Sequence, residues 1–485
     1  MKTFYITTAI DYVNAAPHIG HAYEKIIADT IARWHRLNGE DVFFLTGTDE
    51  NAQKNEQAAR EKGVETKRFV DVNSKKFEEL CKKLNISNND FIKTTEKRHV
   101  IVAQNIFKKV YEKSDIYKGF YEGYYCEGCE AFLTEKELVD GKCPEHNKEP
   151  IWLKEESYFF KLSKYQDKIL ELLKSKDFVI PESKRNEMVS RLENEGLKDI
   201  SVSRNKLKWG IDVPINKNHK IYVWFDALIN YVSAIGYPNG NKFKKYWPAD
   251  VHLIGKGINW FHSVIWPGIL FSAGMKISKH IVVHGYLTVN GQKIGKSLDN
   301  VIDPINLVNK YGVDELRYFL IREIPFGEDG DFSEDALKNR INNELANDLG
   351  NLVSRSLTLA EKFKGETQGK DELSKKLNLK LINEYMDKFE LHNALSEIWK
   401  FVNDVNKYVN DKQPWNLEGK ELSNVLYNLL ESLRIISILV SPFMPETSEK
   451  INKQLGIKEG KLKNCKFSKT KYKIKKTEHL FEKIK

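Results

Sequence analysis

The first fifty residues constrain the fold most, because a strand, a helix and a second strand follow one another closely. Residues 3–10 (TFYITTAI) are rich in Thr, Tyr and Ile, which favours a buried strand. Residues 19–37 keep helical spacing through Ile26, Ile27 and Ile31, and Gly39 marks the stop. Residues 41–50 (DVFFLTGTDE) predict the next strand. A strand, helix and strand in this order form a right-handed parallel unit, so we predict a doubly wound, Rossmann-type parallel sheet.

Later segments indicate that this sheet is interrupted and then resumed. A Gly-, Cys- and aromatic-rich stretch from about residue 117 is typical of a small insertion. Strand-to-helix patterns at 220–236 and 250–274, and a strand at 280–289, return to the parallel sheet. From about Asp335 the apolar residues follow helical spacing, which predicts a helix bundle. We expect segment boundaries at 1–115, 116–205, 206–285, 286–340 and 341–485.

Bulk composition narrows the class of protein. A chain of 485 residues is expected to hold two to four domains. The formal charge of +9 fits either a polyanionic partner or a Lys-rich solvated surface. Five cysteines are too few for a disulfide scaffold, and the N-terminal residues read as a strand rather than a signal peptide. No stretch approaches the run of about 18 apolar residues that a membrane span needs, so we expect a cytosolic protein without membrane contact.

Three of the five cysteines lie in a metal-binding pattern. Cys126-x-x-Cys129 is followed, after thirteen residues, by Cys143-x-x-His146. This is the spacing of a tetrahedral zinc site, and Gly128 and Pro144 suit tight turns around the ligands. With four protein ligands and no open position, we predict structural zinc.

The turn after the first strand has the features of a phosphate site. In parallel sheets the ligand lies at the carboxyl ends of the strands, so residues 8–11 and 47–51 should reach one crevice. His18 and His21 flank Gly20 where the helix begins, and the free N–H groups of a helix N-terminus attract phosphate. These few residues are equally explained by two surface histidines near a helix cap.

A second stretch, NGQKIGKSLDN, lies far away in the sequence. Lys293 and Lys296 flank a small turn that ends in Ser297. Two ammonium groups there would stabilise charge on a leaving pyrophosphate. On its own the stretch also fits a solvated lysine pair.

Together the two stretches resemble the HIGH and KMSKS signatures of class I aminoacyl-tRNA synthetases. Further runs, among them FLTGTDEN, YVWFDALINYVSA, HLIGKGINWFHSVIWP and NDLGNLVSR, are similar to the methionyl-tRNA synthetase family over nearly the whole chain. The insertion is too short for the editing domain of the Ile, Val and Leu enzymes. The resemblance implies a ligase that joins methionine to tRNA(Met) through an adenylate, with Mg²⁺-bound ATP. It also implies a Rossmann catalytic domain, a zinc-bearing insertion, a stem-contact segment and an α-helical anticodon-binding domain with a basic tail.

The resemblance also assigns residue roles. His18, His21, Lys293 and Lys296 would be catalytic, and Gly20, Glu24, Gly255, Lys256 and Ser297 would join them around ATP. Asp49 would hold the methionine ammonium group. The methionine pocket would be completed by Ala9, Ile10, Tyr12, Trp224, Ala227, Tyr231, Ile258 and His262, although spacing alone favours ordinary core packing for Trp224 and Tyr231.

In the helical half, Asn351 and Arg355 lie four residues apart on one helix face. Trp415 follows a proline at a helix end, where its ring can stack on an unpaired base. The resemblance implies that these three residues contact the anticodon. A capped helix pair with a packed Trp is the alternative.

Three positions depart from the family pattern. Gly257 replaces an aspartate expected at the ribose, Asn51-Ala52 replaces His-Gly, and Gly295 replaces a serine. Two other functions therefore stay open: a class I synthetase for another amino acid such as cysteine, and a non-catalytic tRNA-binding paralogue. Too little chain follows Ile457 for an added dimerisation domain, so we expect a monomer.

Overall fold

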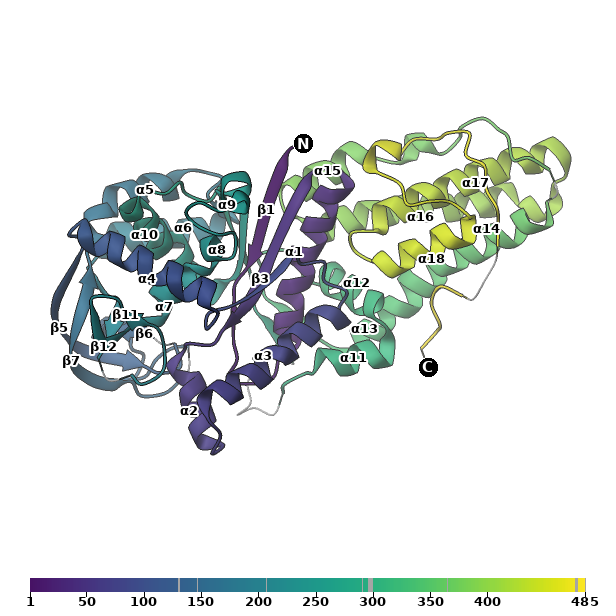
Figure 1. The fold of residues 1–485 in the computed structure, drawn as a ribbon. Helices are drawn as coiled ribbons and strands as arrows, with labels where there is room; N and C mark the ends of the chain where they lie inside the picture. The colour runs from purple at the N-terminus through teal and green to yellow at the C-terminus, as the bar shows by residue number, and fades with distance from the viewer. Residues whose placement is uncertain are drawn as a thin grey trace.

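The chain folds into an α/β lobe and a helical lobe that lie side by side (Figure 1). The computed structural model describes residues 1–129, 131–145, 147–205, 207–289, 291–294, 300–363, 365–475 and 479–484, without the side chains of Ala131 and Lys293. The first strands and helix α1 lie in the middle of the molecule, between the rest of the α/β lobe and the helical lobe.

A parallel sheet forms the centre of the α/β lobe, as the sequence predicts. Its strands run in the order β2-β3-β1-β13-β14-β8, and β4 also pairs with β3. Every pairing is parallel. The strands are β1 (Thr3–Thr8), β2 (Asp11–Tyr12), β3 (Asp41–Asp49), β4 (Asp90–Lys93), β8 (Val179–Ile180), β13 (Val251–Gly255) and β14 (His280–His284).

Alternate residues of these strands enter two different cores, because successive side chains of a strand point to opposite faces. Ile6 and Phe44 pack on α1 (Ile19–Leu37) and α12 (Val313–Glu323). Tyr5 and Phe43 face the opposite core, with α4 (Lys97–Glu112) and α10 (Trp266–Ala273). Helices therefore cover both faces of the sheet, and its carboxyl edge is left to form a site. The remaining helices of this lobe are α2 (Gln53–Glu61), α3 (Thr66–Lys83), α5 (Gln166–Lys174), α6 (Glu182–Glu195), α7 (Val223–Leu228), α8 (Asn230–Ser233), α9 (Asn241–Tyr246) and α11 (Pro304–Tyr311).

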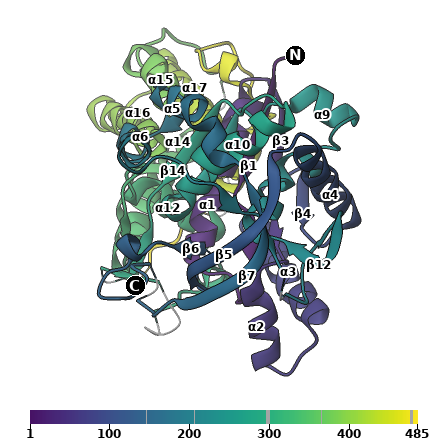
Figure 2. The ribbon, with the colours of Figure 1, turned by 90° about the vertical axis from the view of Figure 1, so that its left-hand side faces the viewer.

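The expected insertion contains a separate antiparallel sheet with the order β6-β5-β7-β9 (Figure 2). Its strands are β5 (Ile116–Cys126), β6 (Ala131–Leu133), β7 (Ile151–Phe160) and β9 (Ile200–Ser201). Strand β8, although it lies within the same segment, pairs with β14 of the central sheet. The segment boundaries stay predictions.

The strand expected at the start of residues 220–236 does not join the parallel sheet. It is β12 (Asn216–Ile221), which pairs antiparallel with β10 (Ser203–Arg204) and β11 (Asp212–Val213). The prediction of a parallel strand there was wrong, because a tight connection between Val213 and Asn216 makes a hairpin, and hairpin strands run antiparallel. A third small sheet joins β15 (Leu287–Val289), β16 (Gln292–Lys293) and β17 (Gly330–Phe332).

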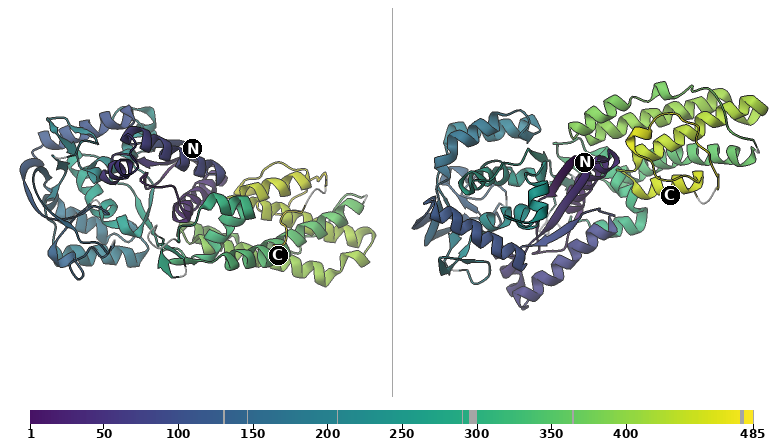
Figure 3. Two further views of the ribbon diagram at one scale, coloured as in Figure 1. Left: turned by 90° about the horizontal axis from the view of Figure 1, so that it is seen from below. Right: turned by 45° about the horizontal axis from the view of Figure 1, so that its top comes forward.

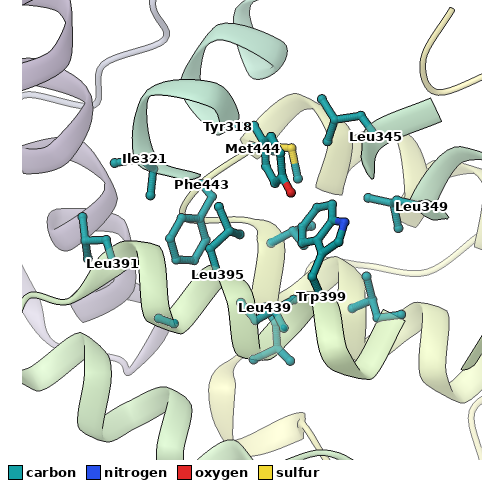
Figure 4. Close-up of a cluster of buried hydrophobic side chains, with 14 of the residues drawn as sticks. Tyr318, Ile321, Leu345, Leu349, Leu391, Leu395, Trp399, Leu439, Phe443 and Met444 are labelled. Atoms are coloured by element: carbon teal, nitrogen blue, oxygen red, sulfur yellow. The ribbon is translucent and has the colours of Figure 1, made fainter. Parts of the chain in front are cut away.

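The helical lobe confirms the bundle expected after Asp335 (Figure 3). Its elements are α13 (Glu334–Arg340), a π-helical segment (Ile341–Gly350), α14 (Asn351–Lys362), α15 (Leu379–Asp387), α16 (Leu391–Lys412), α17 (Gly419–Val440) and α18 (Pro445–Leu455). Figure 4 shows part of its core, in which Trp399 of α16 packs with Tyr318 of α12, their ring centroids 4.6 Å apart. Helix α17 is long and apolar enough to cross a membrane, but 89% of its most apolar stretch is buried, as in the core helix of a bundle.

One buried arginine joins the two lobes. Arg317 of α12 forms an ion pair with Asp29 of α1 at 2.7 Å, and both side chains are fully buried. The same guanidinium donates to the carbonyl oxygens of Pro442 and Phe443, just before α18. Since His18 caps the N-terminus of α1, this contact ties the helical lobe to the helix that carries the first signature.

Candidate active site

A cavity of about 500 Å³ opens at the carboxyl ends of β1, β3 and β13, where ligands of parallel sheets bind. Residues from both signatures and from α7, α8 and the segment after β13 line it. All nine residues expected around methionine are among them: Ala9, Ile10, Tyr12, Asp49, Trp224, Ala227, Tyr231, Ile258 and His262. Of the residues expected around ATP, His18, His21, Glu24 and Gly255 line the cavity. Gly20 and Lys256 do not, and Lys256 Nζ instead donates to Asp329 Oδ2 at 2.6 Å.

The two histidines cap helix α1 with their own side chains. His18 Nδ1 accepts from the Gly20 N–H at 3.1 Å, and His21 Nδ1 accepts from the His18 N–H at 3.0 Å. The rings lie 3.9 Å apart between centroids. Burial is the main cause that lowers the pKa of each to about 3, so both imidazoles are neutral at pH 7. With Nδ1 accepting, the proton is on Nε2, which is left to donate to a ligand.

The helix start differs from the prediction in one respect. We expected free N–H groups for phosphate, but the Ile19 N–H donates to Ile302 O at 3.0 Å, and the next two N–H groups bond to His18. The His18 imidazole accepts the Gly20 N–H, as a Ser or Asp cap usually does, whereas the Ile19 and His21 N–H groups donate to backbone oxygens. The donors offered to a ligand are therefore ring N–H groups rather than backbone ones.

Sequence reasoning missed a buried charge cluster beside these rings. Lys25 Nζ lies 2.9 Å from both Asp11 Oδ2 and Glu24 Oε1. Burial raises the pKa of Asp11 to about 6, whereas Lys25 is the main group that lowers the pKa of Glu24 to about 2, against the effect of its burial. The signal was available, because Lys25 follows His21 by four residues and so lies on the same helix face.

The end of the cavity that is expected to hold methionine has aromatic walls and a hydrogen-bonded Tyr–His pair. Trp224 stacks on Phe261 with a centroid separation of 3.7 Å. Tyr231 donates its hydroxyl to His262 Nε2 at 2.7 Å, and His262 Nδ1 donates to Ile258 O at 3.0 Å. Burial lowers the pKa of His262 to about 4, which keeps it in this neutral form. Polarizable rings and one oriented hydroxyl suit a thioether side chain.

Asp49 lies at the end of β3 and is buried. Its Oδ1 accepts from the Asn51 N–H at 3.0 Å and from Thr94 Oγ1 at 3.2 Å. Asn51 Nδ2 in turn donates to Asp226 Oδ2 at 2.8 Å, on the helix that carries Trp224. Asn51, one of the departures from the family pattern, therefore supports the pocket through a buried network.

Ala52, the neighbouring departure, also fits its site. It is fully buried, and its φ of −64° needs no glycine. Sequence reasoning also missed Lys54, which lines the cavity and lies 3.3 Å above the centre of the Tyr12 ring.

Described residues in and just after the second signature line the same cavity. Ile294 and Val301 line the cavity together with His18 and His21. Gly295, Lys296 and Ser297 lie outside the described residues, as does the side chain of Lys293. The two signatures thus approach one crevice, although the roles of the lysines stay predictions.

The cysteine cluster forms a candidate metal centre in the insertion. The Sγ atoms of Cys126, Cys129 and Cys143 all lie within 4.8 Å of one another. Thiolates gathered this closely fit a metal ion, and their chemistry suits zinc. His146, the predicted fourth ligand, lies outside the described residues.

The expected anticodon residues meet on one surface of the helical lobe. The Arg355 guanidinium lies 5.5 Å from the centre of the Trp415 ring, and its Nη2 donates to Asn410 Oδ1 at 3.1 Å. Trp415 is 53% exposed, which argues against the packed alternative. Asn351 is exposed one turn before Arg355 on α14.

Comparisons with known proteins agree with this geometry. The family model "tRNA synthetases class I (M)" matches residues 4–150 and 146–357, and "Anticodon-binding domain of tRNA ligase" matches residues 375–485. A methionine–tRNA ligase of Caldanaerobacter subterraneus is 51% identical over 94% of this chain and 74% of its own length. The Rickettsia felis ligase is 46% identical over 94% of this chain and 92% of its own length. Mycobacterium tuberculosis methionyl-tRNA synthetase, solved with methionyl-adenylate, has a TM-score of 0.95 and 40% identity over 99% of this chain and 100% of its own.

The fold, the two signatures and the family models define an aminoacyl-tRNA synthetase of class I. Within that class the chain belongs to the methionine–tRNA ligases. The expected fold class, with an α/β parallel-sheet domain and a helical anticodon-binding domain, is confirmed.

Proposed function

We propose that the cavity described above carries out methionine activation with the residues that line it. The observation that carries the proposal is that one cavity brings the nine expected methionine residues together with His18 and His21. The M. tuberculosis enzyme, whose fold this chain shares, was solved with methionyl-adenylate. Methionine, ATP and tRNA(Met) are accordingly the substrates that we assign.

In the first step a methionine carboxylate oxygen attacks the α-phosphorus of ATP, and pyrophosphate leaves. Asp49 would hold the ammonium group, while the Tyr231–His262 pair and Trp224 would enclose the side chain. The Nε2–H groups of His18 and His21 would bind phosphate oxygens, and Lys293 and Lys296 would stabilise the leaving charge. Because the imidazoles are neutral and fixed before the substrate arrives, catalysis would depend on positioning rather than on a covalent side-chain nucleophile.

In the second step a hydroxyl of the 3′-terminal ribose of tRNA attacks the methionyl carbonyl, and AMP leaves. Asn351, Arg355 and Trp415 would contact the anticodon on the helical lobe. Exposed Trp415 beside a guanidinium suits stacking on an unpaired base. Cytoplasmic location and a monomeric state stay predictions.

Two metal ions belong to the proposal. Zinc would be held by Cys126, Cys129, Cys143 and His146 and would stabilise the fold of the insertion. Mg²⁺ would arrive with ATP and neutralise its phosphate charge. We expect Cys129→Ser to lower bound zinc, measured by metal analysis of the purified protein, and Cys465→Ser to leave it unchanged.

The test of the proposed activity is amino-acid-dependent exchange of pyrophosphate into ATP over a panel of amino acids. Methionine alone is expected to support rapid exchange. Exchange with cysteine and not methionine would contradict the substrate assignment. Binding of tRNA without exchange for any amino acid would instead indicate the non-catalytic paralogue.

A further inference from the structure

Gly257 and the side chain of Tyr286 lie against each other in the wall of the cavity. Both residues line it, as do Gly255 and Ile294 of the second signature. A Cβ atom at position 257 would lie 2.0 Å from the Tyr286 hydroxyl oxygen and 3.2 Å from its Cζ. The tyrosine hydroxyl therefore occupies the space into which a side chain at position 257 would project.

Backbone conformation does not explain this glycine. Gly257 is absent from the described glycines with a φ in the left-handed region, so an L-residue could adopt its conformation. A side chain at position 257 would have to displace the tyrosine hydroxyl. The absence of the expected aspartate and the position of Tyr286 are thus linked, because both concern the same space in the cavity wall.

Tyr286 is held in place from several sides. Its N–H donates to Asp329 Oδ1 at 2.8 Å, and the same carboxylate accepts from Lys256, whose Nζ lies 4.6 Å from the centre of the Tyr286 ring. A tyrosine hydroxyl can accept a hydrogen bond at its oxygen as well as donate one.

The position of this oxygen in the cavity indicates which part of the substrates it would contact. Under the proposed function, phosphates lie at His18 and His21, and methionine lies at Trp224 and Tyr231. The wall formed by Gly255, Gly257 and Tyr286 is then left for the nucleoside. The ribose is joined directly to the α-phosphate, and its hydroxyls are donors that need an acceptor.

We infer that the Tyr286 hydroxyl oxygen accepts a hydrogen bond from a ribose hydroxyl of ATP, in the role that a carboxylate at position 257 would otherwise fill. A phenol oxygen and a carboxylate oxygen are alike in accepting from an O–H group. This inference rests on the proposed function, because it needs ATP in the cavity.

The experiment compares ATP with 2′-deoxy-ATP and 3′-deoxy-ATP in methionine-dependent pyrophosphate exchange. We expect the wild-type enzyme to prefer ATP over one of the two deoxynucleotides. Tyr286→Phe should raise the KM for ATP about 5-fold, the effect of one lost neutral hydrogen bond. It should also abolish that preference and leave the KM for methionine unchanged.

Three further variants make the result specific. Gly257→Ala should reproduce the loss of preference, because its Cβ displaces the hydroxyl. Tyr286→Phe combined with Gly257→Asp should restore the preference through the new carboxylate. Tyr246→Phe removes a tyrosine–carboxylate hydrogen bond of 2.8 Å at the far end of β3, to Asp41, and should behave as wild type.

The outcomes separate the two proposals. An active enzyme in which Tyr286→Phe and Gly257→Ala both keep the wild-type preference for ATP would overturn the inference alone. A wild-type enzyme without methionine-dependent exchange would overturn the proposed function, and the inference with it. If Tyr286→Phe does not fold, Gly257→Ala decides the question.

Discussion

At the N-terminus of α1 the rings of His18 and His21 are held by hydrogen bonds to the backbone and lie close to the Asp11–Lys25 ion pair. On the helical lobe, by contrast, Trp415 is 53% exposed and Arg355 donates a hydrogen bond of 3.1 Å to Asn410. The first arrangement is rigid before the substrate arrives. The second leaves an aromatic face in water. This contrast follows from the tasks proposed for each, because stabilising charge in a transition state needs donors that do not reorganise, and stacking on a flexible loop of RNA needs an accessible ring.

The largest effect should come from removing a charge of the second signature. Lys296→Ala is expected to lower the rate of methionine-dependent pyrophosphate exchange by about 100- to 1000-fold, the usual effect of losing one group that stabilises transition-state charge. The binding of tRNA should hardly change, because the helical lobe is untouched. Lys244→Ala, an exposed lysine of α9, serves as the control. Normal exchange by the Lys296 variant would remove the second signature from the mechanism.

The opposite pattern is expected on the helical lobe. Trp415→Ala should raise the KM for tRNA in aminoacylation by about 5- to 150-fold, which corresponds to the roughly 1–3 kcal/mol of one base–aromatic stack. Pyrophosphate exchange without tRNA should stay at the wild-type rate. Trp415→Phe should keep most of the affinity, and Trp152→Ala, at a tryptophan 57% exposed on the insertion, should have no effect. If Trp415→Ala lost pyrophosphate exchange as strongly as it lost affinity for tRNA, the two regions would not act independently.

Much of the cavity could be predicted from sequence because its parts are local. In the β1–α1–β3 unit the helix has the expected bounds and each strand ends one or two residues earlier than expected, since apolar periodicity and Gly39 specify the unit within one stretch of chain. The expected methionine residues then meet because the carboxyl ends of parallel strands lie at one edge of the sheet. Local pattern and topology were sufficient for this part.

The features that were missed depend on contacts between distant segments. The carbonyl oxygen of Ile302 accepts a hydrogen bond from the Ile19 N–H, and Asp329 accepts one from Lys256. The Tyr286 hydroxyl occupies the space beside Gly257. No periodicity encodes such pairings. The error at β12 has a related origin. The apolar run after Lys220 belongs largely to helix α7, and the polar strand before it is placed by the hairpin connection at Val213–Asn216.

The smallest expected effect is on the pH dependence of stability, and it tests whether the histidine rings at α1 are shielded from water. His18 and His21 have native pKa values lowered to about 3, against about 6.5 in an unfolded chain. Between these values the unfolded state binds more protons than the native state, so their contribution to stability falls as the pH drops below about 6.5. The nearby carboxyl of Asp11, with its pKa raised to about 6, acts in the opposite direction, because its protonation favours the native state.

Comparing variants isolates the histidines from Asp11 and from other titrating groups. The free energy of unfolding, measured by urea at pH 7 and pH 5, should fall less in the His18→Asn and His21→Asn double variant than in wild type. The difference should be about 2 kcal/mol for the pair, after allowing for the partial exposure of both rings. Arg355→Gln changes the exposed surface without adding or removing a group that titrates in this range, so it should keep the wild-type pH dependence. An equal fall in all three proteins would mean that the rings titrate normally and that the head of α1 is as open to water as the anticodon surface.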